Sequence, residues 1–96
     1  PEIKWNGEFT KTAKVGDIVI VPEYTVSDNY SSAEKISVAI YVETPAHQLY
    51  MLPGNSIQVN HVGVYEFRVM VVDESGNVTV QSYEMTVIAN TEAQGV

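Results

Sequence analysis

The chain contains no cysteine, and this absence removes several kinds of chemistry at once. Without a thiol there can be no disulfide, no thiolate metal site, no cysteine nucleophile and no thiol redox couple. Small secreted domains often rely on disulfides for stability. A chain of 96 residues that lacks them must hold its fold through a compact and continuous apolar core.

Basic residues are also scarce, since five Lys and Arg stand against twelve Asp and Glu, for a net charge of −7. The five are scattered along the chain: Lys4, Lys11, Lys14, Lys35 and Arg68. Proteins that bind phosphate backbones carry clustered Lys and Arg. Nucleic acid and anionic membrane surfaces are therefore poor partners, and the charge mainly favours solubility.

No apolar run reaches the length of a membrane-spanning helix, so we expect no direct membrane insertion. No basic segment followed by an apolar one opens the chain, as it would in a signal peptide. The first residues are Pro1-Glu2-Ile3, without an initiator Met. The chain is therefore interpreted as one domain cut from a longer polypeptide, with any signal peptide or anchor outside it.

The helical spacing of apolar residues is missing, and an alternation of apolar and polar residues takes its place. The alternation runs through 35–43, 64–72 and 83–88, and more briefly through 56–60, which predicts strands. The apolar members are expected in the core: Ile36, Val38, Ile40, Val42, Ile57, Val59, Tyr65, Phe67, Val69, Val71, Tyr83, Met85 and Val87.

Two places in this pattern leave alternatives open. Residues 18–21, Ile-Val-Ile-Val, are apolar on both faces up to Pro22, so either both faces are covered or one is exposed. Val78 and Val80 have the opposite phase to Met85. Either a bulge lies near Gln81–Ser82, or both valines face outward near the hairpin tip.

Turn signals separate the strands, at Val15-Gly16-Asp17, the polar stretch 27–32, Pro45, Pro53-Gly54-Asn55 and 74–77. Short strands at this spacing predict an all-β antiparallel sandwich. We expect the domain to span 10–89, with 90–96 as a C-terminal linker. Residues 1–9 are either linker or a first edge strand that carries Trp5.

Three stretches resemble a known family. They are Val15-Gly16-Asp17 with Pro22 and Val26-Ser27-Asp28-Asn29, then the run Gly-Val-Tyr-Glu-Phe-Arg-Val-Met-Val-Val-Asp over 63–73, then Glu74-Ser75-Gly76-Asn77 with a last strand ending Met85-Thr86-Val87. Together they cover about residues 13–88. The sequence resembles the bacterial immunoglobulin-like repeats of surface and secreted proteins, including the hyalin-repeat-like group.

The resemblance implies an immunoglobulin-like sandwich with Greek-key topology, about seven strands and no disulfide. Tyr65 matches the tyrosine corner, with a buried ring and a hydroxyl bonded to a nearby backbone group. Phe67 stands where antibody-type domains have a cysteine, and faces Val19 or Val21. Structural roles are thereby expected for Tyr65, Phe67, Val69, Val71, Gly76 and Asn77. The implied location is extracellular, on a bacterial surface or secreted.

Catalytic motifs are absent from the sequence, which contains no G-x-S-x-G, H-E-x-x-H, P-loop or G-x-G-x-x-G. His47 and His61 fall in predicted loops or strand ends. A sandwich of this size also offers little room for a closed pocket. The chain is therefore predicted not to be an enzyme.

Calcium is the one cofactor that the sequence leaves open. Asp28, Asn29 and Asp73 could meet at one end of a sandwich, where their oxygens would suit Ca²⁺. No EF-hand loop or cadherin-type linker motif accompanies them. Asp and Asn also favour turns by bonding their own backbone, which explains the same residues without a metal.

Aromatic residues that the core does not need offer a second kind of site. Trp5, Tyr24, Tyr30, Tyr41 and Tyr50 belong to this group, and Trp5, Tyr41 and Tyr50 are the candidate glycan contacts. Outward tyrosines on strands are also ordinary, because cross-strand pairing favours them.

An apolar outer face would be a third kind of site, formed if six residues share it: Ile18, Ile20, Met70, Val72, Val78 and Val80. The expected partners are neighbouring domains of the same chain, or a host or cell-surface protein or glycan. The sequence thus predicts a non-catalytic spacer, presentation or adhesion module. The alternatives are a module that binds glycan or calcium, and an accessory domain of a carbohydrate-active enzyme.

Overall fold

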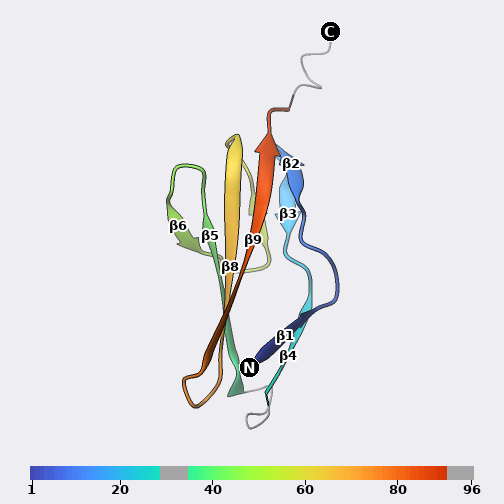
Figure 1. Cartoon of the computed structure of the whole chain (residues 1–96). Helices are drawn as coiled ribbons and strands as arrows, with labels where there is room; N and C mark the ends of the chain where they lie inside the picture. Colours follow the sequence, from blue (N-terminus) through green and yellow to red (C-terminus); the bar gives the residue numbers. More distant parts are fainter. Residues whose placement is uncertain (29–34, 91–96) are drawn as a thin grey trace.

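The protein is built of strands, and the computed structural model describes residues 1–28 and 35–90. Within these ranges there is no helix of the α type, and nine strands follow one another (Figure 1). They are β1 (Glu2–Trp5), β2 (Thr12–Lys14), β3 (Ile18–Ile20), β4 (Tyr24–Ser27), β5 (Ser37–Glu43), β6 (Leu49–Met51), β7 (Ser56–Gln58), β8 (Gly63–Val72) and β9 (Val78–Ile88).

The strands form an all-β, immunoglobulin-like sandwich. A five-stranded sheet has the order β2-β9-β8-β5-β6, and two smaller sheets pair β1 with β4 and β3 with β7. All pairs are antiparallel except β2 with β9, which is parallel. The small sheets make the second layer, because Val19 of β3 and Ile3 of β1 pack on the same core as β8.

The number of strands corrects the expectation of about seven. Pro22 has no backbone N–H and separates β3 from β4. The first strand is divided as well, because β1 pairs with β4 in one layer whereas β2 pairs with β9 in the other. Counting each divided strand once turns the nine segments into seven.

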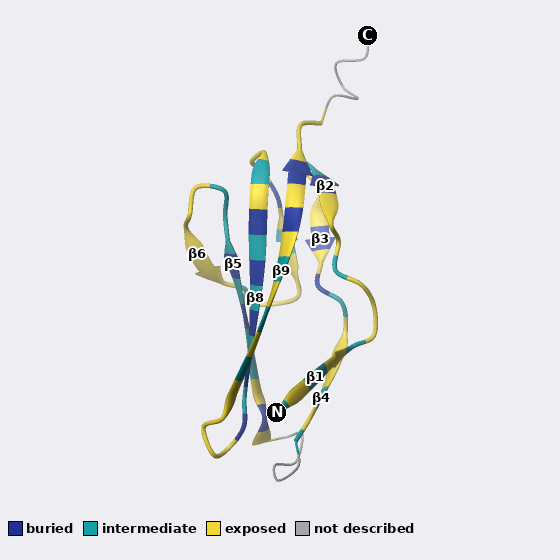
Figure 2. Cartoon of the chain, viewed as in Figure 1, coloured by how far each residue is buried: buried dark blue, intermediate teal, exposed yellow. Residues whose placement is uncertain are grey.

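The core lies along the inward face of β8, as the alternation predicted. Buried and less buried residues alternate along this strand (Figure 2). Val19 and Val21, the two residues expected to face Phe67, both belong to the same core as Phe67. The fully buried side chains are Val42, Val59, Phe67, Val69, Val71, Met85 and Val87.

The strand pairing and the exposure of side chains decide the two alternatives that the sequence left open, a bulge near Gln81–Ser82 and the coverage of 18–21. The register of β8 with β9 runs without interruption from Gly63↔Val87 to Val72↔Val78, so no bulge is present there. Val78 and Val80 instead face outward and are 53% and 54% exposed. In β3, Val19 is buried whereas Ile18 and Ile20 are exposed, so one face of that strand is open.

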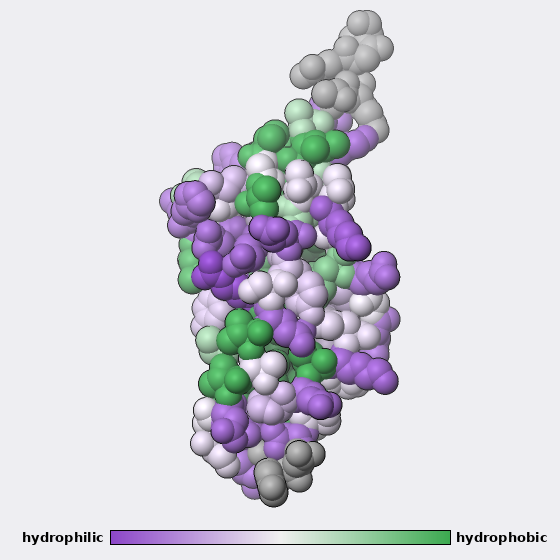
Figure 3. Space-filling model, viewed as in Figure 1, coloured by the Kyte–Doolittle hydropathy of each residue, from purple (hydrophilic) through white to green (hydrophobic). Residues whose placement is uncertain are grey.

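The six residues that would form one apolar patch do not share a face. Ile18 and Ile20 belong to β3, which pairs with β7, whereas Met70, Val72, Val78 and Val80 belong to β8 and β9 in the five-stranded sheet. Figure 3 shows an upper and a lower group of apolar atoms on the viewed face, with hydrophilic atoms between them. A contiguous set of six residues is therefore not formed.

The ends of the chain were expected to be linkers or edges. Residues Glu2–Trp5 form a strand that pairs with β4, in the register Glu2↔Ser27 to Trp5↔Tyr24. Asn90 follows β9 and is exposed. The remainder of the expected linker, 91–96, lies outside the described residues, as does most of the polar stretch 27–32.

Candidate functional site

A row of three glutamates crosses the outer face of the five-stranded sheet. The register sets Glu43 of β5 beside Glu66 of β8, and Glu66 beside Glu84 of β9. Residues directly opposite each other on neighbouring strands point to the same face. Because like charges in this position repel, the row needs a compensating cation.

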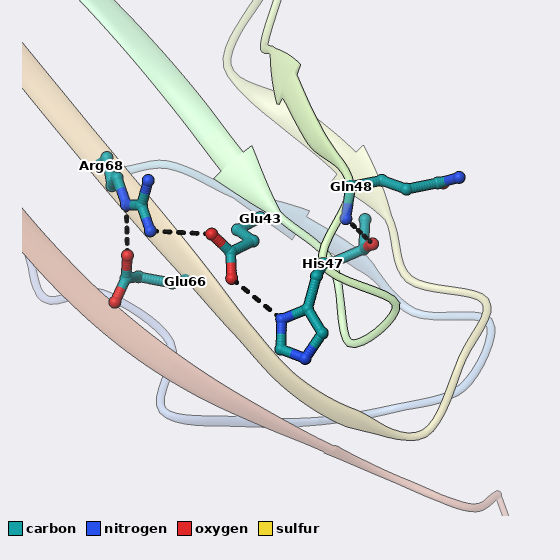
Figure 4. A network of polar contacts seen from close by, with 6 residues as sticks. Glu43, His47, Gln48, Glu66 and Arg68 are labelled. Atoms are coloured by element: carbon teal, nitrogen blue, oxygen red, sulfur yellow. Dashed lines mark hydrogen bonds and ion pairs between the residues drawn. The ribbon is translucent and has the colours of Figure 1, made fainter.

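Arg68 supplies that cation (Figure 4). Its Nη2 donates to Oε1 of Glu43 at 2.7 Å, and its Nε donates to Oε1 of Glu66. The hydrogen bond and charge of Glu66, followed by the charge of Glu43, raise the pKa of Arg68 above its ordinary value. The guanidinium therefore joins β5 to β8 and remains charged.

His47 extends the network to the turn that joins β5 and β6. Its Nδ1 lies 3.2 Å from Oε2 of Glu43, and its backbone has a left-handed φ of 62°. The turn is closed by bonds from Thr44 N to Gln48 O and from His47 N to Thr44 O, both 2.9 Å. The His47 ring is highly exposed to solvent.

The network borders an open depression of about 420 Å³. The lining residues are Glu43, Thr44, Pro45, His47, Gly63, Val64, Glu66 and Glu84. Across residues 1–28 and 35–90, no three His, Asp or Glu side chains are grouped as a metal site would need. The depression is an acidic surface whose carboxylates are partly neutralised by Arg68. The acidic depression was not predicted from the sequence. The three glutamates do occupy outward positions in strands predicted from their apolar–polar alternation, and this was a usable signal.

Replacing Arg68 with methionine should make the stability of the protein increase with salt. Methionine keeps much of the side-chain length but removes the charge, which leaves Glu43, Glu66 and Glu84 to repel one another. Salt screens repulsion between exposed charges within a Debye length of about 10 Å at 0.1 M. Thermal melts at low and high NaCl should therefore show a larger rise in Tm for R68M than for the unmodified protein. An equal salt response of the two proteins would show that Arg68 does not compensate the row.

Two of the three candidate calcium ligands, Asp28 and Asp73, are engaged in other contacts. Asp73 is a buried turn residue: its Oδ1 accepts from the backbone N–H groups of Ser75 and Asn77, and its Oδ2 accepts from Asn77 Nδ2, all within 2.8–2.9 Å. Asp28 lies 3.0 Å from the amino group of Pro1. Asn29 lies outside the described residues.

These contacts agree with the turn interpretation of Asp73. Gly76 has a φ of 88°, a region that glycine enters without strain, and its N–H donates to Asp73 O at 3.1 Å. Asp73 N in turn donates to Asn77 O at 3.0 Å. Gly76 and Asn77 therefore close the β8–β9 hairpin, which is the structural role expected of them.

Trp5 does not form an exposed platform for a sugar. Its ring lies edge-on to Phe9, Tyr24 and Tyr83, with centroid distances of 4.6, 5.5 and 5.9 Å. Its Nε1–H points to the hydroxyl of Tyr83 at 2.8 Å and to Gln81 Oε1 at 3.2 Å. The glycan prediction for Trp5 is thus corrected, because this aromatic cluster fastens β1 to β9.

Tyr41 and Tyr50 do not form a shared platform either. Tyr41 pairs with Met51, and the next pair is Val42 with Tyr50, so the two tyrosines lie on opposite faces of the sheet. Tyr50 is exposed, and its hydroxyl donates to Gln48 Oε1 at 2.6 Å. The three aromatic residues chosen from the sequence are therefore not brought together.

The Tyr65 ring is buried as the tyrosine corner requires, at 2% exposure. Within residues 1–28 and 35–90 its hydroxyl makes no hydrogen bond to a backbone group. The buried ring is confirmed, whereas the expected hydroxyl contact is wrong for the part of the chain that the structure describes. His61, like His47, is exposed.

Neither a scan of protein-family models nor a comparison with curated proteins finds a match to this chain. The resemblance to bacterial immunoglobulin-like repeats consequently remains an expectation drawn from the motifs. In the described ranges, no helix has the length and apolar character needed to cross a bilayer.

Proposed function

We propose that the chain is a non-catalytic immunoglobulin-like module of a bacterial surface or secreted protein, where it spaces and presents neighbouring parts of the same polypeptide. One observation carries the proposal: the two ends of the described chain lie at opposite ends of the sandwich (Figure 1). The sequence motifs of surface repeats support the same assignment.

The separation of the ends follows from where the start of the chain contacts β9 and where the chain leaves β9. Pro1 O accepts a hydrogen bond from Thr79 Oγ1 at 2.8 Å, close to the hairpin tip. The chain leaves β9 at Ile88, at the other end of the same strand. The nine steps from Thr79 to Ile88, at roughly 3.3 Å each, separate entry and exit by about 30 Å.

The pairing of β2 with β9 determines how the module bears tension along this axis. The two strands are parallel, in the register Thr12↔Thr86 to Lys14↔Ile88. Tension on the ends of the chain pulls Thr12 and Ile88 in opposite directions along the strands. The inter-strand hydrogen bonds are then loaded together, whereas bonds in a peeled pair break one after another.

The β1–β4 pair comes before the parallel pair on the path of the tension. It is antiparallel, and Glu2, at the entry end, pairs with Ser27. Tension on Pro1 therefore reaches β1 and β4 first, and it loads β2 against β9 once that pair has opened. The parallel pair is accordingly the part of the sandwich that resists extension.

Replacing Val15 with proline should lower the unfolding force measured by single-molecule pulling through the two chain ends. Proline removes the N–H that donates to Ile88 O at 3.0 Å, at the upper end of the parallel pair. Because only three residue pairs of β2 and β9 share the load with this bond, its loss should clearly lower the peak force.

Asn6→Pro is the matched control for this experiment. It removes one backbone bond, Asn6 N to Glu23 O at 2.8 Å, which lies beside the β1–β4 pair and not beside β2 and β9. We expect its peak force to equal that of the unmodified protein. If Asn6→Pro lowers the force as much as Val15→Pro does, the load is not borne by β2 and β9 and the mechanical part of the proposal is wrong.

A further inference from the structure

A second hollow, distinct from the acidic depression, opens between the two layers of the sandwich where Pro22 interrupts the strand. It has a volume of about 540 Å³, within the roughly 300–1,000 Å³ typical of small-molecule sites. Two backbone bonds hold its walls, from Val21 N to Asn55 O at 2.7 Å and from Asn6 N to Glu23 O at 2.8 Å. We call it the Pro22 cleft; its lining residues are Asn6, Val21, Pro22, Glu23, Tyr24, Ile40, Gly54 and Asn55.

The Pro22 cleft has apolar surface on one side and an aromatic ring beside it. Val21 and Ile40 are core residues that contribute to its lining, and Pro22 adds a further apolar surface. Tyr24 is 38% exposed, and its ring lies edge-on to Trp5 at 5.5 Å and 71°. Because Trp5 is itself held by its indole N–H, this wall is fixed before any ligand arrives.

The polar side chains around the cleft are available for hydrogen bonds to a ligand. Asn6, Glu23 and Asn55 are exposed, and neither they nor the Tyr24 hydroxyl form a side-chain hydrogen bond with any other residue that the structure describes. The exposed Tyr50 differs, because its hydroxyl is bonded to Gln48. Two amides, a carboxylate and a phenol thus offer both donors and acceptors to one hollow.

We infer that the Pro22 cleft binds a neutral saccharide. The C–H faces of a sugar ring match Val21, Pro22, Ile40 and the Tyr24 ring, and its hydroxyl groups match the free amides and carboxylate. Among the described residues that line the cleft there is no Lys or Arg, and Glu23 is the one charged group. A sugar acid would therefore bring its negative charge next to Glu23 without a cation to balance it.

The inference goes beyond the proposed spacer role and differs from the set of glycan contacts predicted from the sequence. Tyr24 takes the place of Trp5, Tyr41 and Tyr50 as the ligand-facing ring. Trp5 acts behind it as a support. A spacer whose sandwich binds a neutral glycan would add attachment to spacing, and either property can be lost without the other.

The test is a titration of ¹⁵N-labelled protein with neutral hexose and N-acetylhexosamine oligosaccharides, with uronic-acid oligosaccharides in parallel. We expect shifts of the Asn6, Glu23 and Asn55 signals with a neutral sugar. Asn55→Ala and Glu23→Ala should each weaken binding about tenfold, as expected for the loss of one or two hydrogen bonds. Tyr50→Phe, which removes an exposed hydroxyl on β6, should leave the affinity unchanged.

Three results would overturn the inference. The first is the absence of shifts at the cleft with every neutral sugar at tens of millimolar. The second is tighter binding of the uronic-acid oligosaccharides than of the neutral ones. The third is binding that survives both Asn55→Ala and Glu23→Ala while these variants retain the unmodified melting temperature.

Discussion

Replacing Phe67 with alanine should lower the free energy of unfolding by about 3–5 kcal/mol, the usual cost of removing a buried phenylalanine. The ring is 1% exposed at the middle of β8 and lies 5.8 Å from the ring of Phe9. Urea denaturation followed by tryptophan fluorescence measures the change, because Trp5 is the single tryptophan.

Val80→Ala is the control for Phe67→Ala. Val80 lies on β9 in the same sheet but faces solvent, so we expect a change within about 1 kcal/mol, the full range of strand propensity. A cost for Phe67→Ala no greater than that for Val80→Ala would mean that the core does not lie on this face of β8.

Replacing Gly63 with alanine should destabilise the protein by about 2–4 kcal/mol, since left-handed strain alone costs about 1–3 kcal/mol. Gly63 begins β8 with a φ of 135°. A Cβ placed there would lie 2.7 Å from Cβ of Pro45 and 2.9 Å from its Cγ, too close for both to stay in position. The same urea titration measures the loss.

Substitutions at two other glycines distinguish the two causes of the lost stability, the positive φ and the clash with Pro45. Gly76 has a positive φ of 88° but open space around it, so Gly76→Ala should show the strain without the clash. Gly54 has neither, and Gly54→Ala should be neutral or stabilise by about 0.4–1 kcal/mol by restricting the unfolded chain. A loss for Gly63→Ala no larger than for Gly76→Ala would remove the contact with Pro45 from the explanation.

The long strands could be predicted because one face of each is buried and the other is not. In β8 the apolar residues recur at every second position, and this period specifies both the strand and its inward face. The phase change near Val80 was visible too. Its meaning became clear once the unbroken register with β8 was known.

The short strands were harder to predict. β7 lies in the predicted strand 56–60 and β3 in the apolar run 18–21, whereas β2 and β6 escaped prediction. A strand of three residues is too short for a period of two to stand out. Their pairing depends on distant segments, as in the parallel pair of β2 with β9. Residues far apart in the chain also decide the role of Trp5, since its indole N–H meets Gln81 and Tyr83.

The Pro22 cleft escaped prediction for a related reason. Its walls come from Asn6, Glu23, Tyr24 and Asn55, which share no motif. Two backbone bonds that continue the β1–β4 and β3–β7 pairings bring them together. The sequence identified Tyr24 as a ring that the core does not need, but nothing in the pattern distinguished it from Tyr41 or Tyr50.

The most direct test of the proposed function compares two pulling directions on the same sandwich. Because the chain has no cysteine, Ile18→Cys provides a unique attachment point at an exposed position just after β2. Pulling between position 18 and the C-terminus peels β2 from β9 at Ile88, whereas pulling between the two chain ends shears the same pair. We predict an unfolding force that is clearly higher in the end-to-end direction. Equal forces, or a lower force end to end, would contradict a module built to bear tension through β2 and β9.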